Sequence, residues 1–127
     1  MNTSSSSVGT GQIFLVGAGP GDPGLLTLRG LECLKKAECV LYDYLVNPAV
    51  LDYCSPQANK ICLGQHRRAN VWTQQAINQR MVDLAKAGQT VVRLKGGDPA
   101  IFSRMADEID ALVRAGIPFE VVPGITA

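Results

Sequence analysis

The sequence predicts an α/β fold, with a mainly parallel, five-stranded sheet and helices on both faces. Three observations lead to it. Short apolar segments alternate with longer segments of helical periodicity along most of the 127 residues. Hydrophobic residues make up 46% of the chain, which is enough for the core of one compact domain. Strands separated by helices favour right-handed crossovers, which pair the strands in parallel.

Five short apolar segments are the predicted strands, and each stops at or near a glycine, an aspartate or a polar loop. Their nearly continuous apolar character is typical of strands that are covered on both faces. They span residues 12–16, 39–42, 60–63, 90–94 and 119–122.

The first predicted helix precedes the second predicted strand, and the second, shorter helix follows that strand. Asp22 and Pro23 suit the N-cap and the first residue of one helix. Leucines recur along it at every third position, 25, 28, 31 and 34, and indicate a helical stripe. A shorter helix is expected from Asn47 and Pro48 through Tyr53.

Two longer helices are expected in the second half of the chain. Thr73 is the expected N-cap of a helix that runs to about Ala87, and Gly88 stands where a left-handed helix end is expected. Gly116 closes the last helix. The apolar residues that mark the two helices are Ile77, Met81 and Leu84 on the inner face of the first, and Ile109, Leu112 and Val113 in the second.

Composition excludes several classes of partner. The 12 basic and 11 acidic residues leave a net charge of +1, which gives no global attraction to nucleic acid or to acidic membranes. No apolar run approaches the roughly 20 residues that a transmembrane helix needs. His66 is the only histidine and no Cys-x-x-Cys pair is present, so no metal site is expected.

The start of the chain predicts a tail rather than a secretory signal. The first residues lack the basic and apolar regions of a signal peptide, so no secretory signal is expected, and residues 1–11 are expected to be a disordered tail. Residues 12–127 are then the folded lobe. Three of the four cysteines lie in apolar segments, where a thiol packs as a small hydrophobic group. We therefore expect a cytoplasmic, reducing location without disulfides.

Glycines and charged residues follow the predicted strands, at the edge where parallel α/β sheets bind ligands. The first loop, residues 17–22, reads Gly-Ala-Gly-Pro-Gly-Asp. A dinucleotide fingerprint needs glycine at the position of Asp22, and a Walker A loop needs a closing Gly-Lys-Ser/Thr. Because the Asp22 carboxylate repels a pyrophosphate, the loop suits a hydroxyl, an amine or a polar heterocycle. The alternative is a strand-to-helix turn without function.

An acidic residue follows the second strand. Asp43 lies 24 residues beyond Gly19, close to where a NAD-binding fold keeps its ribose-binding acid. This spacing leaves a nucleotide-binding oxidoreductase open as an alternative function. A capping or solvent-facing aspartate is the other alternative for Asp43.

Two further strand ends carry candidate binding residues. Gly96 and Gly97, followed by Asp98-Pro99, indicate a sharp turn or a close approach to a ligand. The loop 65–68 reads Gln-His-Arg-Arg, and its arginines can bind carboxylates or phosphates in a bidentate manner or form a solvated basic loop. His66 is a weak candidate base.

Taken in order, these segments resemble the tetrapyrrole methylase family and, within it, the uroporphyrinogen III C-methyltransferases. The resemblance extends from about Gln12 to Ala127 and depends on the order and spacing of several segments. These segments are residues 16–23 (VGAGPGDP), 25–27 (LLT), 42–43 (YD), 92–99 (VRLKGGDP) and 122–127 (VPGITA).

The resemblance implies the N-terminal lobe of a two-lobed enzyme, with a C-terminal lobe missing from this sequence and a homodimer of the full-length protein. The implied reaction transfers methyl groups from S-adenosylmethionine to uroporphyrinogen III, giving S-adenosylhomocysteine and precorrin-2, the precursor of sirohaem and cobalamin. Asp43 matches the family's proton acceptor. The residues that match cofactor contacts are Pro20, Gly96, Gly97, Asp98, Ile101, Thr126 and Ala127.

Four residues are candidates for contact with the tetrapyrrole. Gly21 and Asp22 lie beside the matched cofactor residue of the first loop. Arg67 and Arg68 suit the carboxylates of uroporphyrinogen III, because a guanidinium binds a carboxylate through two parallel hydrogen bonds.

The sequence departs from the family at three places. The family has Lys-Arg where this chain has Gln65-His66, and that lysine serves as proton donor; Gln65 cannot, so either His66 substitutes or the role is dispensable. Tyr44 replaces an arginine after Asp43. The family's Phe-Gly-Arg-Gly-Gly-Glu-Glu reads FSRMADE over residues 102–108, without the glycines beside the cofactor loop. An inactive fragment or a non-catalytic interaction domain of the family is a further alternative.

Overall fold

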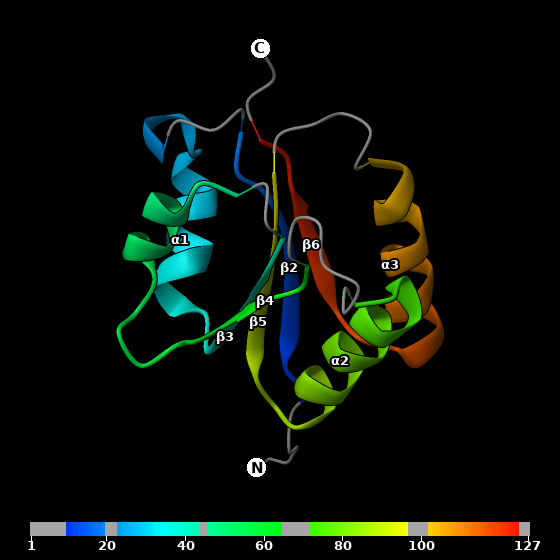
Figure 1. Cartoon of the computed structure of the whole chain (residues 1–127). Coiled ribbons are helices and arrows are strands. Elements are labelled where there is room, and N and C mark those ends of the chain that lie inside the picture. Colours follow the sequence, from blue (N-terminus) through cyan, green and yellow to red (C-terminus); the bar gives the residue numbers. More distant parts are fainter. Residues whose placement is uncertain (1–9, 20–22, 44–45, 65–71, 97–101, 125–127) are drawn as a thin grey trace.

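A parallel sheet of five strands forms the centre of the molecule (Figure 1). The computed structural model describes residues 10–19, 23–43, 46–64, 72–96 and 102–124. Neighbouring strands pair in parallel in the order β4-β3-β5-β2-β6. The predicted fold class is confirmed. The strands are β2 (Gln12–Gly17), β3 (Cys39–Tyr42), β4 (Asn59–Cys62), β5 (Thr90–Lys95) and β6 (Phe119–Val122).

Helices cover the sheet on both sides, as Figure 1 shows. One face carries α1 (Leu28–Lys36) and the 3₁₀ helix η2 (Pro48–Tyr53), and we call it the α1 face. The opposite face carries α2 (Gln74–Lys86) and α3 (Phe102–Ala115), and we call it the α2/α3 face. A short 3₁₀ helix, η1, spans Pro23–Leu25 before α1.

The start of the first α-helix differs from its prediction. α1 begins at Leu28, and its N-cap is Thr27, whose hydroxyl oxygen accepts a hydrogen bond from the Gly30 amide at 3.0 Å. The leucine stripe was also wrong, since Leu28 is 86% exposed while Leu34 is fully buried. Three residues turn a helix through roughly 300°, so a strict three-residue spacing moves around the helix instead of following one face.

The ends of the other helices agree with the sequence analysis. The Thr73 hydroxyl oxygen accepts a hydrogen bond from the Ala76 amide at 3.1 Å and caps α2. Gly88 and Gly116 follow α2 and α3 with positive φ angles of 89° and 71°. Val113 marks α3 but is 61% exposed, so it does not belong to the core.

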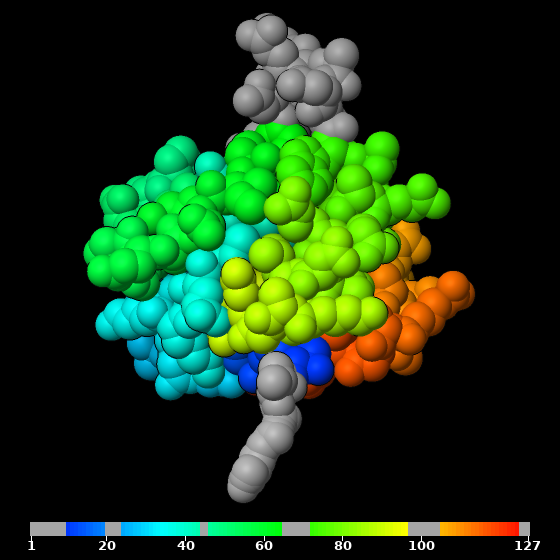
Figure 2. All heavy atoms as spheres, turned by 90° about the horizontal axis from the view of Figure 1, so that it is seen from below, coloured from blue at the N-terminus to red at the C-terminus, as the bar shows by residue number. Residues whose placement is uncertain are grey.

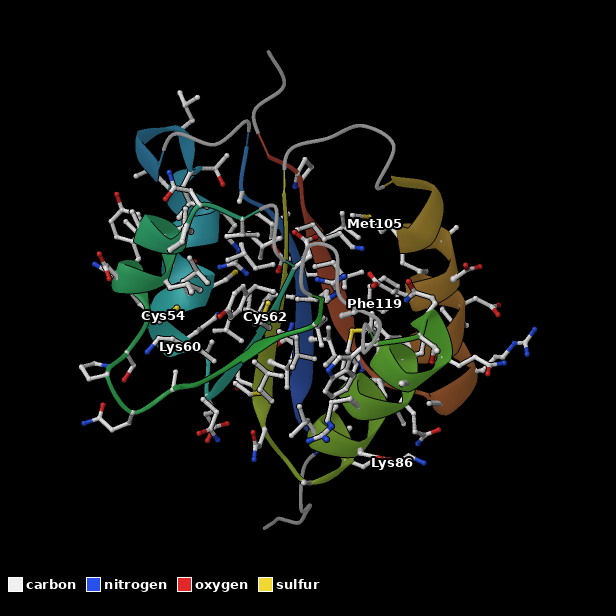
Figure 3. The ribbon with its side chains drawn as sticks, in the orientation of Figure 1. Cys54, Lys60, Cys62, Lys86, Met105 and Phe119 are labelled. Carbon is white, nitrogen blue, oxygen red and sulfur yellow. The ribbon has the colours of Figure 1, made fainter. Side chains whose placement is uncertain are left out.

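Apolar side chains fill the space between the sheet and each helical layer. The largest buried side chain of the α1-face cluster is Phe14, and Cys54, which follows η2, packs there too. Figure 3 shows Met105 and Phe119 on the α2/α3 face, on the opposite side of the sheet from Cys54. All four cysteines are free thiols.

The amino end of the sheet is closed by packing. Seen from that end, the start of β2 lies between the α1 side, the α2–β5 connection and α3 (Figure 2). The Gly11 amide donates to the carbonyl of Ala85 at 2.6 Å, and a Cβ on Gly11 would lie 1.8 Å from the carbonyl oxygen of Gln89. Gly11, placed in the predicted tail, is thus held against the α2–β5 turn, while residues 1–9 of that tail lie outside the described residues.

Candidate functional site

The predicted site residues follow the carboxyl ends of the strands. Asp43 follows β3 and Gly96 follows β5, so the parallel sheet brings both to one edge. The other predicted residues lie outside the described part of the chain. They are Pro20, Gly21, Asp22, Gln65, His66, Arg67, Arg68, Gly97, Asp98, Ile101, Thr126 and Ala127.

Glycines let the ends of β2 and β6 approach at backbone distance. A Cβ on Gly17 would lie 2.6 Å from the amide nitrogen of Gly124, and a Cβ on Gly124 would lie 2.9 Å from the amide nitrogen of Gly19. Gly19 also has a φ of 80°, which residues with a Cβ rarely adopt. This part of the edge therefore presents main chain rather than side chains, and bulkier residues would push the two strand ends apart.

The end of β5 joins this glycine contact to the rest of the edge. The Ala18 amide donates to the carbonyl oxygen of Lys95 at 2.8 Å. On the other side of β5, Tyr42 is the register partner of Leu94, which brings Asp43 beside Lys95. The Leu63 amide in turn donates to the Tyr42 carbonyl at 2.8 Å. The exits of β2, β5, β3 and β4 thus form one connected edge.

Asp43 is half-buried at this edge. Its carbonyl accepts a hydrogen bond from the Val46 amide at 3.2 Å. The charge of Asp43 also acts on the Lys95 ammonium group and raises the pKa of Lys95, against stronger opposing effects. Asp43 therefore lies at the strand edge that the sequence predicts for it, close to the Lys95 ammonium group.

A buried ionic network beneath the edge escaped the sequence analysis. Glu108 on α3 is fully buried; one of its carboxylate oxygens lies 3.0 Å from Lys95 Nζ, and the other accepts a hydrogen bond from Arg93 Nε at 3.1 Å. The Gln74 side-chain amide of α2 also donates to Glu108, at 3.2 Å. We call Arg93, Lys95, Glu108 and Gln74 the Glu108 network. It ties β5, α2 and α3 together.

Burial has the largest effect on the protonation of Lys95. Lys95 is 2% exposed. Burial lowers the pKa of the Lys95 ammonium most strongly, and the neighbouring Arg93 charge lowers it further, while Glu108 and Asp43 oppose both effects. Lys95 therefore loses its proton at a lower pH than an ordinary lysine.

A sequence signal for the network did exist. Alternate residues of a strand face the same side, so Val91, Arg93 and Lys95 share a face that Val91 identifies as the covered α2/α3 face. Two cations on a covered face require a buried anion, and Glu108 stands one helical turn before the buried Leu112.

One departure from the family pattern can be located. Met105, which stands where the family has glycine, is 9% exposed and packs in the apolar cluster of the α2/α3 face (Figure 3). Ala106, which stands at the next lost glycine after Met105, is exposed. The larger side chain of Met105 is thus accommodated in the core.

Other features of the described residues contribute no chemistry to this edge. No three histidine, cysteine or acidic side chains gather there as a metal-binding group. A surface hollow of about 820 Å³ lies between α2 and α3, with Val82, Lys86 and Arg114 in its lining, and its described lining residues belong to these helices and the Thr73 cap rather than to the strands. Among the helices of the described ranges, none combines the length and the apolar character that crossing a membrane would need.

Comparison with known proteins identifies the family. A family model described as Tetrapyrrole (Corrin/Porphyrin) Methylases matches residues 12–127. The chain belongs to this tetrapyrrole methylase family. The resemblance seen in the sequence is confirmed, and it displaces the nucleotide-binding oxidoreductase as an interpretation of Gly19 and Asp43.

Individual relatives of this tetrapyrrole methylase domain are closely similar. A siroheme synthase of Pseudomonas fluorescens (strain Pf0-1) is 57% identical over 120 residues, covering 94% of this chain and 26% of that protein. Uroporphyrin-III-C-methyltransferase from Thermus thermophilus has a similar structure, with a TM-score of 0.79 and 47% identity, covering 92% of this chain and 49% of that one.

A further structure adds a ligand to the comparison. Uroporphyrin-III C-methyltransferase from Thermus thermophilus complexed with S-adenosyl homocysteine matches with a TM-score of 0.74 and 46% identity, covering 91% of this chain and 46% of that one. The domain thus spans about half the length of the solved structures and about a quarter of the siroheme synthase.

Proposed function

We propose that this domain is the N-terminal, cofactor-binding lobe of an enzyme that methylates uroporphyrinogen III with S-adenosylmethionine. The observation that carries the proposal is the 46% identity to a uroporphyrin-III C-methyltransferase complexed with S-adenosyl homocysteine. The product would be precorrin-2, on the routes to sirohaem and cobalamin. We further propose a homodimeric protein of the cytoplasm, without nucleic acid or membrane partners.

The described edge fits such a cofactor. S-adenosylmethionine carries amine, carboxylate, hydroxyl and adenine groups, which main-chain N–H and C=O groups can bind. The glycine contact of Gly17, Gly19 and Gly124 leaves main chain exposed at short range. When bound, the cofactor supplies a methyl group already activated on a sulfonium. We propose that it is held by Pro20, Gly96, Gly97, Asp98, Ile101, Thr126 and Ala127.

Asp43 is the proposed proton acceptor. It stands at the strand edge beside the β5 exit, where a carboxylate can take the proton that the pyrrole unit releases once its ring carbon has received the methyl group. Gln65 stands in place of the family lysine, so either His66 serves as the proton donor or the reaction needs no such donor. We propose that Arg67 and Arg68, with Gly21 and Asp22, bind the carboxylate-rich tetrapyrrole.

Calorimetry and a product assay test this function separately. The complete gene product is titrated with S-adenosylhomocysteine and then assayed with uroporphyrinogen III and methyl-labelled cofactor. We expect binding, and label in precorrin-2. No binding of S-adenosylhomocysteine at millimolar concentration overturns the proposal. Binding without label in precorrin-2 favours a non-catalytic interaction domain, the alternative that the missing family lysine at Gln65 suggests.

A pair of aspartate variants tests the role of Asp43. Asp43→Asn removes the proton acceptor and should lower the methyl-transfer rate by about 100-fold or more, while the affinity for S-adenosylhomocysteine changes less than about threefold. Asp52→Asn, at an exposed position in η2, is the matched control and should keep the rate. Equal rates for the two variants would exclude the proposed role of Asp43.

A further inference from the structure

The Glu108 network lies at the base of the β5–α3 connection. Resting on the proposed function, we propose that Lys95, paired with Glu108, is a positioning residue that holds the Gly96 end of this connection and Asp43 in the geometry for cofactor binding. Nothing in this role requires Lys95 to touch cofactor or substrate, and its 2% exposure keeps it beneath the edge.

The first argument is connectivity. Lys95 is the last residue of β5, and Glu108 lies on α3, so the 3.0 Å contact between Lys95 Nζ and Glu108 Oε1 bridges the two elements on either side of residues 96–101. The main-chain carbonyl of Lys95 also accepts a hydrogen bond from the Ala18 amide at 2.8 Å. Lys95 therefore makes two links. Its side chain contacts α3, at the far end of the β5–α3 connection, and its carbonyl contacts the glycine-rich end of β2.

The second argument is charge. Arg93 and Lys95 are two buried cations, whereas Glu108 is the one buried carboxylate among the described residues. Arg93 already neutralises Glu108 through the 3.1 Å contact, so Lys95 is not needed to balance the carboxylate. Apolar residues of similar volume usually pack at least as stably as buried ion pairs. Core packing alone therefore does not account for a lysine at this position.

The third argument is the location of the extra positive charge. The charged groups that face Lys95 in the described structure are Arg93 on β5, Glu108 on α3 and Asp43 after β3. Glu108 is shared with Arg93, and Asp43 is the carboxylate at the site edge. Lys95 thus links the buried network to the proposed proton acceptor by charge, and to the cofactor connection by position.

Two matched variants of the complete gene product test the proposal. Lys95→Met leaves Arg93 paired with Glu108, and Arg93→Met leaves Lys95 paired with Glu108, so each removes one buried cation and keeps one ion pair. S-adenosylhomocysteine affinity is measured by calorimetry and Tm by thermal unfolding. We expect Lys95→Met to weaken affinity about tenfold with an unchanged or higher Tm, and Arg93→Met to weaken it less than about threefold.

The pH dependence of affinity supplies a readout that a purely structural role would not change. The wild type should lose affinity at alkaline pH as Lys95 loses its proton, at a pH below the ordinary lysine value of 10.5. Lys95→Arg should retain affinity over the same range, because a guanidinium stays charged.

Several outcomes would overturn the proposal. They are equal losses of affinity in Lys95→Met and Arg93→Met, a loss that follows the fall in Tm, an unfolded Lys95→Met protein, or the same alkaline loss in Lys95→Arg as in the wild type. A wild type that binds no S-adenosylhomocysteine overturns the proposed function as well. A wild type that binds while Lys95→Met binds equally well overturns the role of Lys95 alone.

Discussion

The two faces of the sheet bury different chemistry. The α1 face is filled by an apolar cluster, whereas the α2/α3 face adds the Glu108 network to its apolar cluster. A single strand supplies both, since β5 directs Val92 and Leu94 to the α1 face and Arg93 and Lys95 to the other. The alternation of one central strand thus separates packing from charge.

This difference matters because both faces end at the same edge, which carries the candidate site. The α1 face supports the edge through close packing, which tolerates polar substitution poorly. The α2/α3 face supports it through an ion pair next to Gly96 and Asp43, which can respond to pH. The comparison predicts that equivalent truncations on the two faces fail for different physical reasons.

The largest effect is expected from removing the shared carboxylate. Glu108→Ala leaves Arg93 and Lys95 buried without a counter-charge and should lower the free energy of unfolding by about 3–5 kcal/mol. Asp110→Ala, two residues along α3, is the control; its exposed pair with Arg114 should contribute less than about 1 kcal/mol. Urea unfolding measures both, and similar losses would show that the Glu108 network is not a buried charge centre.

A cavity on the α1 face should have the next largest effect. Leu34→Ala removes a fully buried side chain and should lower the free energy of unfolding by about 3 kcal/mol at every pH. Leu28→Ala changes the same residue type on the same helix at 86% exposure and should cost less than about 0.5 kcal/mol. Equal losses at the two positions would contradict the observed orientation of α1.

Local signals predicted most of the fold. The five strands, the Thr73 cap and the left-handed Gly88 and Gly116 each depend on residues close together in sequence, and each is confirmed. The start of α1 was wrong because Asp22 and Thr27 are both good caps, and the chain forms η1 before the α-helix begins. A local rule cannot decide between two competing caps.

The candidate site was predictable only in part. Asp43 and Gly96 lie at the predicted edge, because the carboxyl ends of parallel strands meet there. Glu108 was missed, because its contacts with Arg93 and Lys95 join residues 15 and 13 positions apart across two elements. The sequence indicates two cations on a covered strand face, but only tertiary packing shows which anion meets them.

The helix caps should show where the two faces are alike. Thr27→Ala on α1 and Thr73→Ala on α2 each remove one side-chain acceptor for a helix amide, at 3.0 Å and 3.1 Å respectively. Each should lower the free energy of unfolding by about 1 kcal/mol, and the variants Thr27→Ser and Thr73→Ser should keep most of the wild-type stability. Thermal unfolding measures the four proteins. A loss at one cap several times that at the other would extend the contrast between faces to the helix ends.

The smallest expected effect is a difference in pH slope between the faces. Burial raises the pKa of the Cys33 and Cys54 thiols on the α1 face, so the unfolded chain ionises first and their contribution to stability is lost as the pH rises above about 8.5. The other face also buries a thiol with a raised pKa, Cys39, but Lys95 there has the opposite sign: its lowered pKa makes its contribution rise with pH up to the ordinary value of 10.5.

Urea unfolding between pH 7 and 10, with reductant present, separates these contributions. The Cys33→Ala/Cys54→Ala variant should lose stability with pH less steeply than the wild type, whatever its stability at pH 7. Lys95→Met should lose stability more steeply, because it lacks the group whose contribution rises. Between pH 7 and pH 10, the change in unfolding free energy of each variant should differ from that of the wild type by less than about 1 kcal/mol. Parallel slopes for the three proteins would mean that the two faces do not differ in how their buried groups titrate, and the contrast would then be one of packing alone.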